Sequence, residues 1–236
     1  MHPANLHYFP LSLPFFFILV ALFVAVLILV QLKILRYAYT AIGISRRHAF
    51  ILLLLSLLGS YVNIPVAQLP AEQVVTGKEI FFFGMHYVVP MVQDWPGTMI
   101  AVNVGGAVIP VILSVYLILQ NKLYIQGFWA ILIVAIVCHL LSHPVPGLGI
   151  AEPVFVPPIV TTLAALLLSR QNAAPLAYIS GSLGTLIGAD LLNLDKIRGL
   201  GAPIVSIGGA GTFDGIFVTG ILAVILASLA DFLRKT

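Results

Sequence analysis

The chain has 236 residues, of which 61% are hydrophobic and only 8% are charged. Soluble domains carry about 25% charged residues, so this composition excludes a soluble globular protein and predicts an all-α polytopic membrane protein. A formal net charge of +3 gives no signature of nucleic-acid binding, and the single cysteine, Cys138, excludes an internal disulfide.

Apolar runs that approach the ~20 residues needed to cross a bilayer recur along the whole chain. Seven are found, at 11–32, 49–66, 99–119, 126–142, 154–169, 174–192 and 209–232. The first run lacks a preceding Lys or Arg and exceeds the ~7–15 residues of a signal-peptide core, so we interpret it as a retained helix. The fourth and fifth runs are short, which leaves the count open by one helix. We therefore expect residues 1–236 to form a single domain of about seven transmembrane helices.

The basic residues indicate how these helices are oriented. If seven helices alternate, eight Lys and Arg residues fall on one side and three on the other. The eight are Lys33, Arg36, Arg46, Arg47, Lys122, Arg170, Arg234 and Lys235, and the three are Lys78, Lys196 and Arg198. Because cytoplasmic loops are enriched in basic residues, we expect an external N-terminus and a cytoplasmic C-terminus.

Two longer external loops, 67–98 and 193–208, interrupt this pattern. The first contains several proline and glycine breakers and a strand-like stretch near residues 80–89. The second contains Gly199, Gly201 and Pro203, which favour a short hairpin or a re-entrant segment.

A short internal similarity links two glycine-containing segments. Residues 102–107 (Val-Asn-Val-Gly-Gly-Ala) resemble residues 205–210 (Val-Ser-Ile-Gly-Gly-Ala), and each segment opens an outside-to-inside helix. Helix pairs 49–119 and 174–232 would then form a parallel repeat, as in some transporters. The alternative is a chance match, because short glycine-rich matches arise often in apolar sequence.

Asp190 and Asp214 are the strongest candidates for catalysis, because ionisable residues at membrane depth are costly and mark functional sites. A pair of small residues four positions apart lies near each aspartate, and these pairs would let the two helices approach closely. These pairs are Gly184 with Gly188 and Gly211 with Gly215. Two neighbouring carboxylates in a low dielectric share a proton, which suits acid–base hydrolysis and equally proton or cation binding. Alternatively, Asp214 caps a broken helix and Asp190 points into headgroup water.

Further polar and helix-breaking residues are expected to line a cavity beside the aspartates. They are Asn63, Asn103, Gly105, Gly106, Gly188, Gly208, Gly209, Gly211, Phe213 and Gly215. Helix-end capping and close packing are the alternative explanation for this set.

His139 and His143 form a second candidate site. Their i, i+4 spacing would place both imidazoles on one helix face, as zinc-binding pairs require, and Glu152 could complete the ligand set. No glutamate accompanies the pair as in the His-Glu-x-x-His motif, and Pro144 follows directly, so wetted interfacial histidines are the alternative. We predict no cofactor, with a divalent metal as the alternative.

Several of these segments resemble the boxes of an archaeal and bacterial membrane-protein family catalogued only as a domain of unknown function. The boxes are Asn63-Ile64-Pro65, Asn103-Val104-Gly105-Gly106, Gly188-Ala189-Asp190 and Gly208-Gly209-Ala210-Gly211-Thr212-Phe213-Asp214-Gly215. The resemblance runs from about residue 45 to the C-terminus. It implies a multi-pass protein of a prokaryotic plasma membrane and supplies no activity.

A looser likeness connects the aspartates to the intramembrane aspartyl proteases. Phe213-Asp214 is similar to their first aspartate, which follows an aromatic residue, and Gly188-Ala189-Asp190 approximates their Gly-x-Gly-Asp box. Ala189 stands where that box has glycine, the order along the chain is reversed, and no Pro-Ala-Leu segment follows. The likeness is therefore one of geometry.

Three hypotheses about function follow. The first is an intramembrane hydrolase acting on a membrane peptide, with Asp190 and Asp214 as general acid and base. The second is a proton- or cation-coupled transporter of a small solute that uses the same aspartates. The third is a non-catalytic assembly or sensor protein. The expected partners are the lipid bilayer and the peptide or solute, and no nucleic acid.

Overall fold

The computed structural model describes residues 20, 21, 24, 41–82, 85–145, 149–209 and 215–235, and it is mostly helical. Within these residues, three helices have the length and composition to cross a membrane, at Val104–Asn121, Tyr124–Leu141 and Ala173–Ile197. Shorter apolar helices lie at Arg47–Ser56, Val156–Leu168 and Gly215–Asp231. The prediction of a mainly helical protein that spans a membrane is thus confirmed in its coarse form.

Six α-helices form the described bundle. They are α3 (Arg46–Gly59), α4 (Ile109–Asn121), α5 (Tyr124–Leu141), α6 (Val156–Leu168), α7 (Ala173–Thr185) and α8 (Gly215–Lys235). A π-helical turn, η1 (Val104–Val108), leads into α4, and a second, η2 (Leu186–Asp190), prolongs α7 into the 3₁₀ helix η3 (Leu191–Ile197). Both π turns contain glycine.

The strands form three small sheets. The first has the order β1 (Asn63–Gln68), β4 (Met99–Asn103), β7 (Ile204–Ile207), with β4 antiparallel to β1 and parallel to β7. The second is a long antiparallel hairpin of β2 (Glu72–Phe82) and β3 (Met85–Trp95). The third pairs β5 (His143–Val145) with β6 (Gly149–Ala151).

Three expectations differ from this arrangement. The apolar run 49–66 is helical only to Gly59 and continues as β1, and the run 99–119 begins as β4. Short apolar segments have no periodicity that separates strand from helix, and here the pairing of β1, β4 and β7 decides the outcome. Of the two alternatives for the loop 193–208, the hairpin is wrong, since β7 pairs in parallel with β4. The strand-like stretch 80–89 is confirmed as part of the β2–β3 hairpin.

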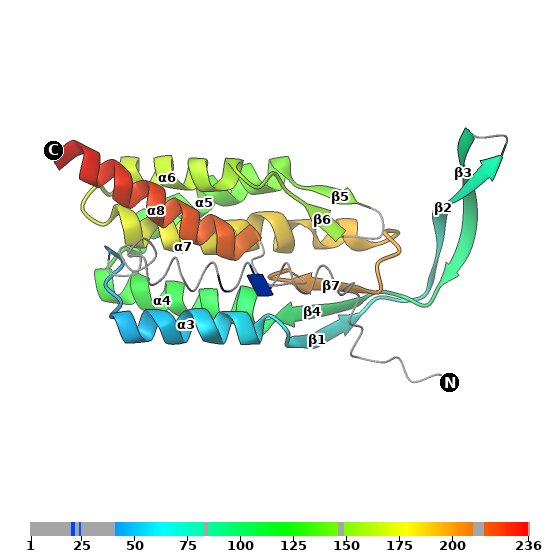
Figure 1. Cartoon of the computed structure of the whole chain (residues 1–236), viewed down its shortest axis with the longest axis horizontal. Helices are drawn as coiled ribbons and strands as arrows, with labels where there is room; N and C mark the ends of the chain where they lie inside the picture. The colour runs from blue at the N-terminus through cyan, green and yellow to red at the C-terminus, as the bar shows by residue number, and fades with distance from the viewer. Residues whose placement is uncertain are drawn as a thin grey trace.

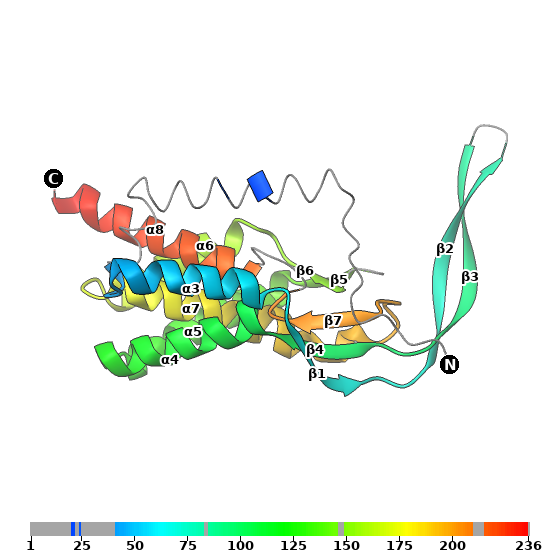
Figure 2. The ribbon, with the colours of Figure 1, turned by 60° about the horizontal axis from the view of Figure 1, so that its bottom comes forward.

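The two ends of the bundle differ in kind. In both views, the α4–α5 and α6–α7 turns lie at the same end as the C-terminus (Figures 1 and 2). The three-stranded sheet lies at the opposite end, and the β2–β3 hairpin projects beyond it. We call these the turn end and the sheet end.

Helix α7 is the centre of the bundle. It packs against α4, α5, α6 and α8, and Leu176, Ala177 and Ile179 are fully buried. A helix that is buried on all sides is expected at the core of a membrane bundle. On the outer helices, by contrast, leucines such as Leu140 and Leu167 are 74% and 80% exposed, which suits a surface solvated by lipid.

Glycines on α7 set the distance to its neighbours. A Cβ added to Gly184 would lie 2.6 Å from the Cβ of Val134 on α5, and one on Gly181 would lie 3.2 Å from the Cα of Gly220 on α8. Small residues at such crossings let helix backbones approach closely in a bilayer.

Candidate functional site

A buried asparagine organises the sheet end. Asn103 is fully buried, and its Nδ2 donates hydrogen bonds to the carbonyl oxygen of Ser60 (2.7 Å) and to Oδ1 of Asn63 (3.1 Å). Its Oδ1 accepts the backbone N–H of Gly106 (2.8 Å), so Asn103 is also the N-cap of η1. One side chain therefore joins α3, β1 and the start of the α4 helix.

Asn63 links this network to β7. Its Oδ1 also accepts a hydrogen bond from Oγ of Ser206 (2.6 Å). Ser206 occupies the position that corresponds to Asn103 in the short internal similarity. The two similar segments thus lie side by side, in the parallel β4–β7 pair, and bind the same oxygen.

The glycines after both strands pack directly on each other. A Cβ on Gly106 would collide with the carbonyl oxygen of Gly208, and a Cβ on Gly105 would collide with the backbone of Ser56 and Ser60. Gly208 and Gly209 have φ values of +88° and +84°, which favour glycine. Of the expected cavity-lining set, Asn63, Asn103, Gly105, Gly106 and Gly208 are brought together. Within it, the Asn103 side chain hydrogen-bonds to both Asn63 and Gly106.

Asp190 lies at the end of η2 and is half-buried. Its Oδ2 accepts the backbone N–H of Gly208 at 2.6 Å. The π-helical turn that positions it is held by the fully buried Asn193, whose Nδ2 donates to the carbonyl oxygens of Gly188 and Ala189, both at 2.9 Å. Gly188 does not face the Asn103 network, because the place of its missing Cβ is occupied by the backbone of Ala135 on α5.

Glu152 follows β6 and reaches the first residue of α8. A Cβ on Gly215 would lie 2.7 Å from Oε1 of Glu152, so a larger residue at position 215 would displace this carboxylate. The Glu152 carboxylate also lies within interaction range of the Cys138 thiol, whose Sγ is 3.6 Å from Oγ1 of Thr185 on α7. Glu152 therefore connects α5 with the start of α8.

Residues 210–214, which include Gly211, Phe213 and the candidate catalytic residue Asp214, lie outside the described residues. The described residues on either side of this segment are each contacted by a carboxylate. Asp190 holds Gly208, and Glu152 lies against Gly215. Glu152 thus lies against the residue that follows Asp214 in the chain, whereas the sequence suggested Glu152 only as a metal ligand.

The prediction that His139 and His143 lie on one helix face is wrong. His139 lies in the last turn of α5, but α5 ends at Leu141, and His143 begins β5. Ser142 adopts an extended conformation before Pro144, so the two imidazoles do not share a helix face. Among the described residues, no group of three or more His, Cys, Asp and Glu side chains could hold a metal ion.

Sequence patterns missed Ser206, Asn193, Cys138 and Thr185. Only Ser206 had a usable signal, since the internal similarity aligns it with Asn103. Cys138 and Thr185 contact each other across 47 residues, which no short motif encodes. Asn193 bonds to carbonyl oxygens only four and five residues before it, but no pattern marked it as a site residue.

Comparison with known families agrees with the resemblance seen in the sequence. Residues 57–226 match the family described as a protein of unknown function, DUF1614, and the chain belongs to this family. No curated protein and no solved structure matches the chain. The family match covers β1, β4, β7, Asp190, Glu152 and Asp214, and therefore every part of the site.

Proposed function

We propose that this family member is an intramembrane hydrolase whose acidic site lies at the sheet end of the bundle, with Asp190 and Asp214 as the catalytic pair. One observation carries the proposal. The glycine-rich segment 208–215 is contacted at Gly208 by Asp190 and at Gly215 by Glu152, and Asp214 precedes Gly215 directly in the chain. Acidic groups from two separate parts of the chain, Asp190 and Glu152, thus contact the ends of the segment that contains Asp214.

Such a pair would hydrolyse an amide by general acid–base catalysis. The ionised carboxylate removes a proton from water as the water attacks the scissile carbonyl carbon, and the protonated carboxylate gives its proton to the carbonyl oxygen. A proton then passes to the leaving nitrogen, the C–N bond breaks, and one proton remains shared by the pair.

The sheet supports a peptide as the substrate. In the described part of the chain, β1 and β7 each pair on one side only, with β4, so both are edge strands. An edge strand can hydrogen-bond an extended peptide along its backbone. Because β7 leads directly to Gly208 and the Asp190 carboxylate, a peptide paired with β7 would run towards the acidic site.

We propose further that the chain crosses the membrane seven times with the sheet end outside. Arg170 and Lys122 lie in turns at the turn end, together with the C-terminus, whereas Lys196 and Arg198 follow Asp190 at the sheet end. This distribution agrees with a cytoplasmic turn end under the positive-inside rule.

The proposed activity is tested by mass spectrometry of peptide termini in membranes that carry wild-type, Asp190→Asn, Asp214→Asn or Asp195→Asn protein. Asp195 is exposed in η3 and is the matched control. We expect new termini of membrane proteins with the wild type and Asp195→Asn, reduced about 10²–10⁴-fold in the other two variants. The cleavage positions should lie in the outer third of the substrate spans; positions in the inner third would contradict the proposed orientation.

Equal termini in all four membranes, with the variants inserted and folded, would refute the hydrolase. One observation then favours the transporter. Oγ1 of the fully buried Thr161 has no hydrogen-bond partner within the described residues, and it lies on α6 beside the Gly181–Gly220 crossing, where a polar path through the membrane would pass. Proton flux into liposomes that is lost in Asp214→Asn would establish that function instead.

A further inference from the structure

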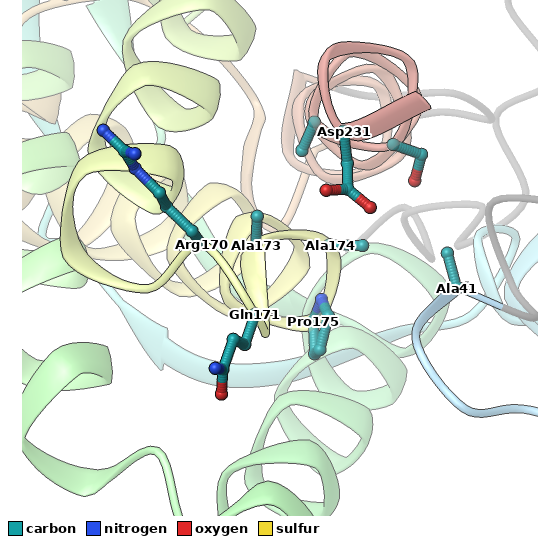
Figure 3. Close-up of a pocket in the computed structure, with 9 residues that line it drawn as sticks. Ala41, Arg170, Gln171, Ala173, Ala174, Pro175 and Asp231 are labelled. Atoms are coloured by element: carbon teal, nitrogen blue, oxygen red, sulfur yellow. The ribbon is translucent and has the colours of Figure 1, made fainter. Parts of the chain in front are cut away.

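The turn end contains a cavity of about 320 Å³, lined by the α6–α7 turn, the first turn of α7 and the last turns of α8 (Figure 3). Neither of its charged side chains is available to a ligand. The Asp231 carboxylate extends towards the first turn of α7 and already interacts with another group of the protein, and the Arg170 guanidinium points away from the cavity. The outer edge of β7, at the sheet end, instead presents backbone groups that have no partner in the described chain.

The hydrogen bonds to β4 fix which groups of β7 point outward. The N–H of Met99 donates to the carbonyl oxygen of Pro203 at 3.0 Å, and β4 and β7 pair in parallel from there. Because successive backbone groups point to alternate sides of a strand, Ile204 and Ser206 then point away from β4. The carbonyl oxygen of Ser206 accepts the N–H of Gly209 at 3.1 Å. Three groups are therefore left on the outer edge: the N–H and the carbonyl oxygen of Ile204, and the N–H of Ser206.

This edge is open, whereas the other edge of the same sheet is not suited to pairing. Among the described elements, β7 has extensive contacts only with β4, so no other described strand or helix packs along it. A row of unpaired N–H and carbonyl groups is a template for another extended chain. On β1, Pro65 has no N–H, and the pairing with β4 shifts register between Pro65 and Ala67. Proline and bulges are features by which edge strands avoid pairing.

Ile204 determines which side chain fits beside this edge. Directly opposite residues of neighbouring strands share a face of the sheet, and Gln68, Met99 and Ile204 form such a row across the three strands. Ile204 ends the row and is 44% exposed. A residue of an added strand opposite Ile204 would pack against it, which favours an apolar side chain. The edge then runs towards the turn at Gly208, whose N–H binds Asp190.

We propose that the substrate of the acidic site is an extended peptide segment that pairs with β7 through these three backbone groups and places an apolar residue opposite Ile204. Ile204 is thus a specificity-determining residue, and the peptide end nearest the turn at Gly208 lies at the Asp190 carboxylate. This inference rests on the proposed hydrolase and specifies how its substrate is recognised.

The test selects octapeptides from a random library on the purified full chain in detergent, with Asp214→Asn to prevent cleavage. The strongest binder is then synthesised again with an N-methyl group on one residue at a time. We expect N-methylation of the residue that donates to the carbonyl oxygen of Ile204 to weaken binding about 2–10-fold. N-methylation of either neighbouring residue should be tolerated, because the adjacent N–H groups of a strand point away from β7.

Two substitutions in β7 test the same pairing from the side of the protein. Ser206→Pro removes an outward N–H and should bind about 2–10-fold more weakly than Ser206→Ala, which also lacks the hydroxyl bond to Asn63 but keeps the N–H. Ile204→Glu should change the residue selected opposite it from apolar to Lys or Arg, with an enrichment of about two- to fivefold.

Failure to select a binder would overturn the proposal, and so would binders that respond to neither substitution and show no alternation in the N-methyl series. These results are distinct from those of the hydrolase test. Alternating binding without new termini would establish the peptide site and refute only the hydrolysis. New termini without alternating binding would keep the hydrolase and overturn recognition by β7.

Discussion

Gly106→Ala is expected to lower the thermal unfolding midpoint of the protein by several degrees. The added Cβ would collide with the carbonyl oxygen of Gly208, which is backbone and cannot move away by a change of rotamer. Overpacking at a tight contact costs about 1–3 kcal/mol, and here the shift would separate η1 from the turn after β7. Because the N–H of Gly208 binds Asp190, the proposed activity should fall as well.

Gly127→Ala is the matched control for this prediction. Gly127 lies inside α5, and a Cβ there would have its nearest contact at 3.9 Å, with Cγ1 of Ile118. Alanine is favoured over glycine in a helix by up to about 1 kcal/mol, so the midpoint should stay the same or rise slightly. Equal midpoints for Gly106→Ala and the wild type in the same detergent would show that the Gly106–Gly208 contact is looser than described.

Asn103→Asp should be the most destabilising single polar substitution at the sheet end. The new carboxylate can still accept the N–H of Gly106, but it cannot donate to Ser60 or Asn63. The carbonyl oxygen of Ser60 and Oδ1 of Asn63, which now accept hydrogen bonds from Asn103, would instead face a buried negative charge. An uncompensated buried charge costs about 3–5 kcal/mol, which would appear as a large drop in the thermal unfolding midpoint.

Asn121→Asp makes the same chemical change in a more exposed place. Asn121 ends α4, and its Nδ2 donates to the carbonyl oxygen of Leu117 at 2.9 Å. Loss of that bond, together with a negative charge at a helix C-terminus, should cost only about 1–2 kcal/mol. If Asn103→Asp were no less stable than Asn121→Asp, the Asn103 network would not organise the sheet end.

The long helices could be predicted from the sequence because their signal is local. The expected spans 126–142 and 154–169 agree with α5 and α6 within two residues at each end. Long apolar runs bounded by polar or breaking residues satisfy their backbone hydrogen bonds internally, so no distant segment is needed to define them. The same reasoning failed at 63–66 and 99–103, where pairing between residues 31 to 40 positions apart replaces the helical hydrogen bonds.

The candidate site was predictable in its residue types more than in its contacts. The cost of placing polar groups at membrane depth identified Asp190, Asn63 and Asn103 as candidates. Asn63 and Asn103 do share a hydrogen bond. The position of Glu152 could not be predicted, because it lies against Gly215, which is 63 positions further along the chain. Nothing local distinguishes that glycine from the others in the segment 208–215.

Disulfide cross-linking of Asp190→Cys with Asp214→Cys, in a Cys138→Ala background, tests the central claim most directly. A protease site inserted between Gly199 and Gly201 would cut the chain between the two cysteines. Asn63→Cys with Ser206→Cys is the positive control, because these side chains hydrogen-bond, and Lys122→Cys with Asp214→Cys is the negative control, because Lys122 lies at the turn end. A disulfide forms only when the two Cα atoms lie within about 7 Å.

Fragments of the 190–214 variant that stay joined until a reductant is added are the predicted result. Fragments that separate without reductant, while the positive control stays joined, would contradict the close approach of the two helices at Asp190 and Asp214 on which the catalytic pair rests.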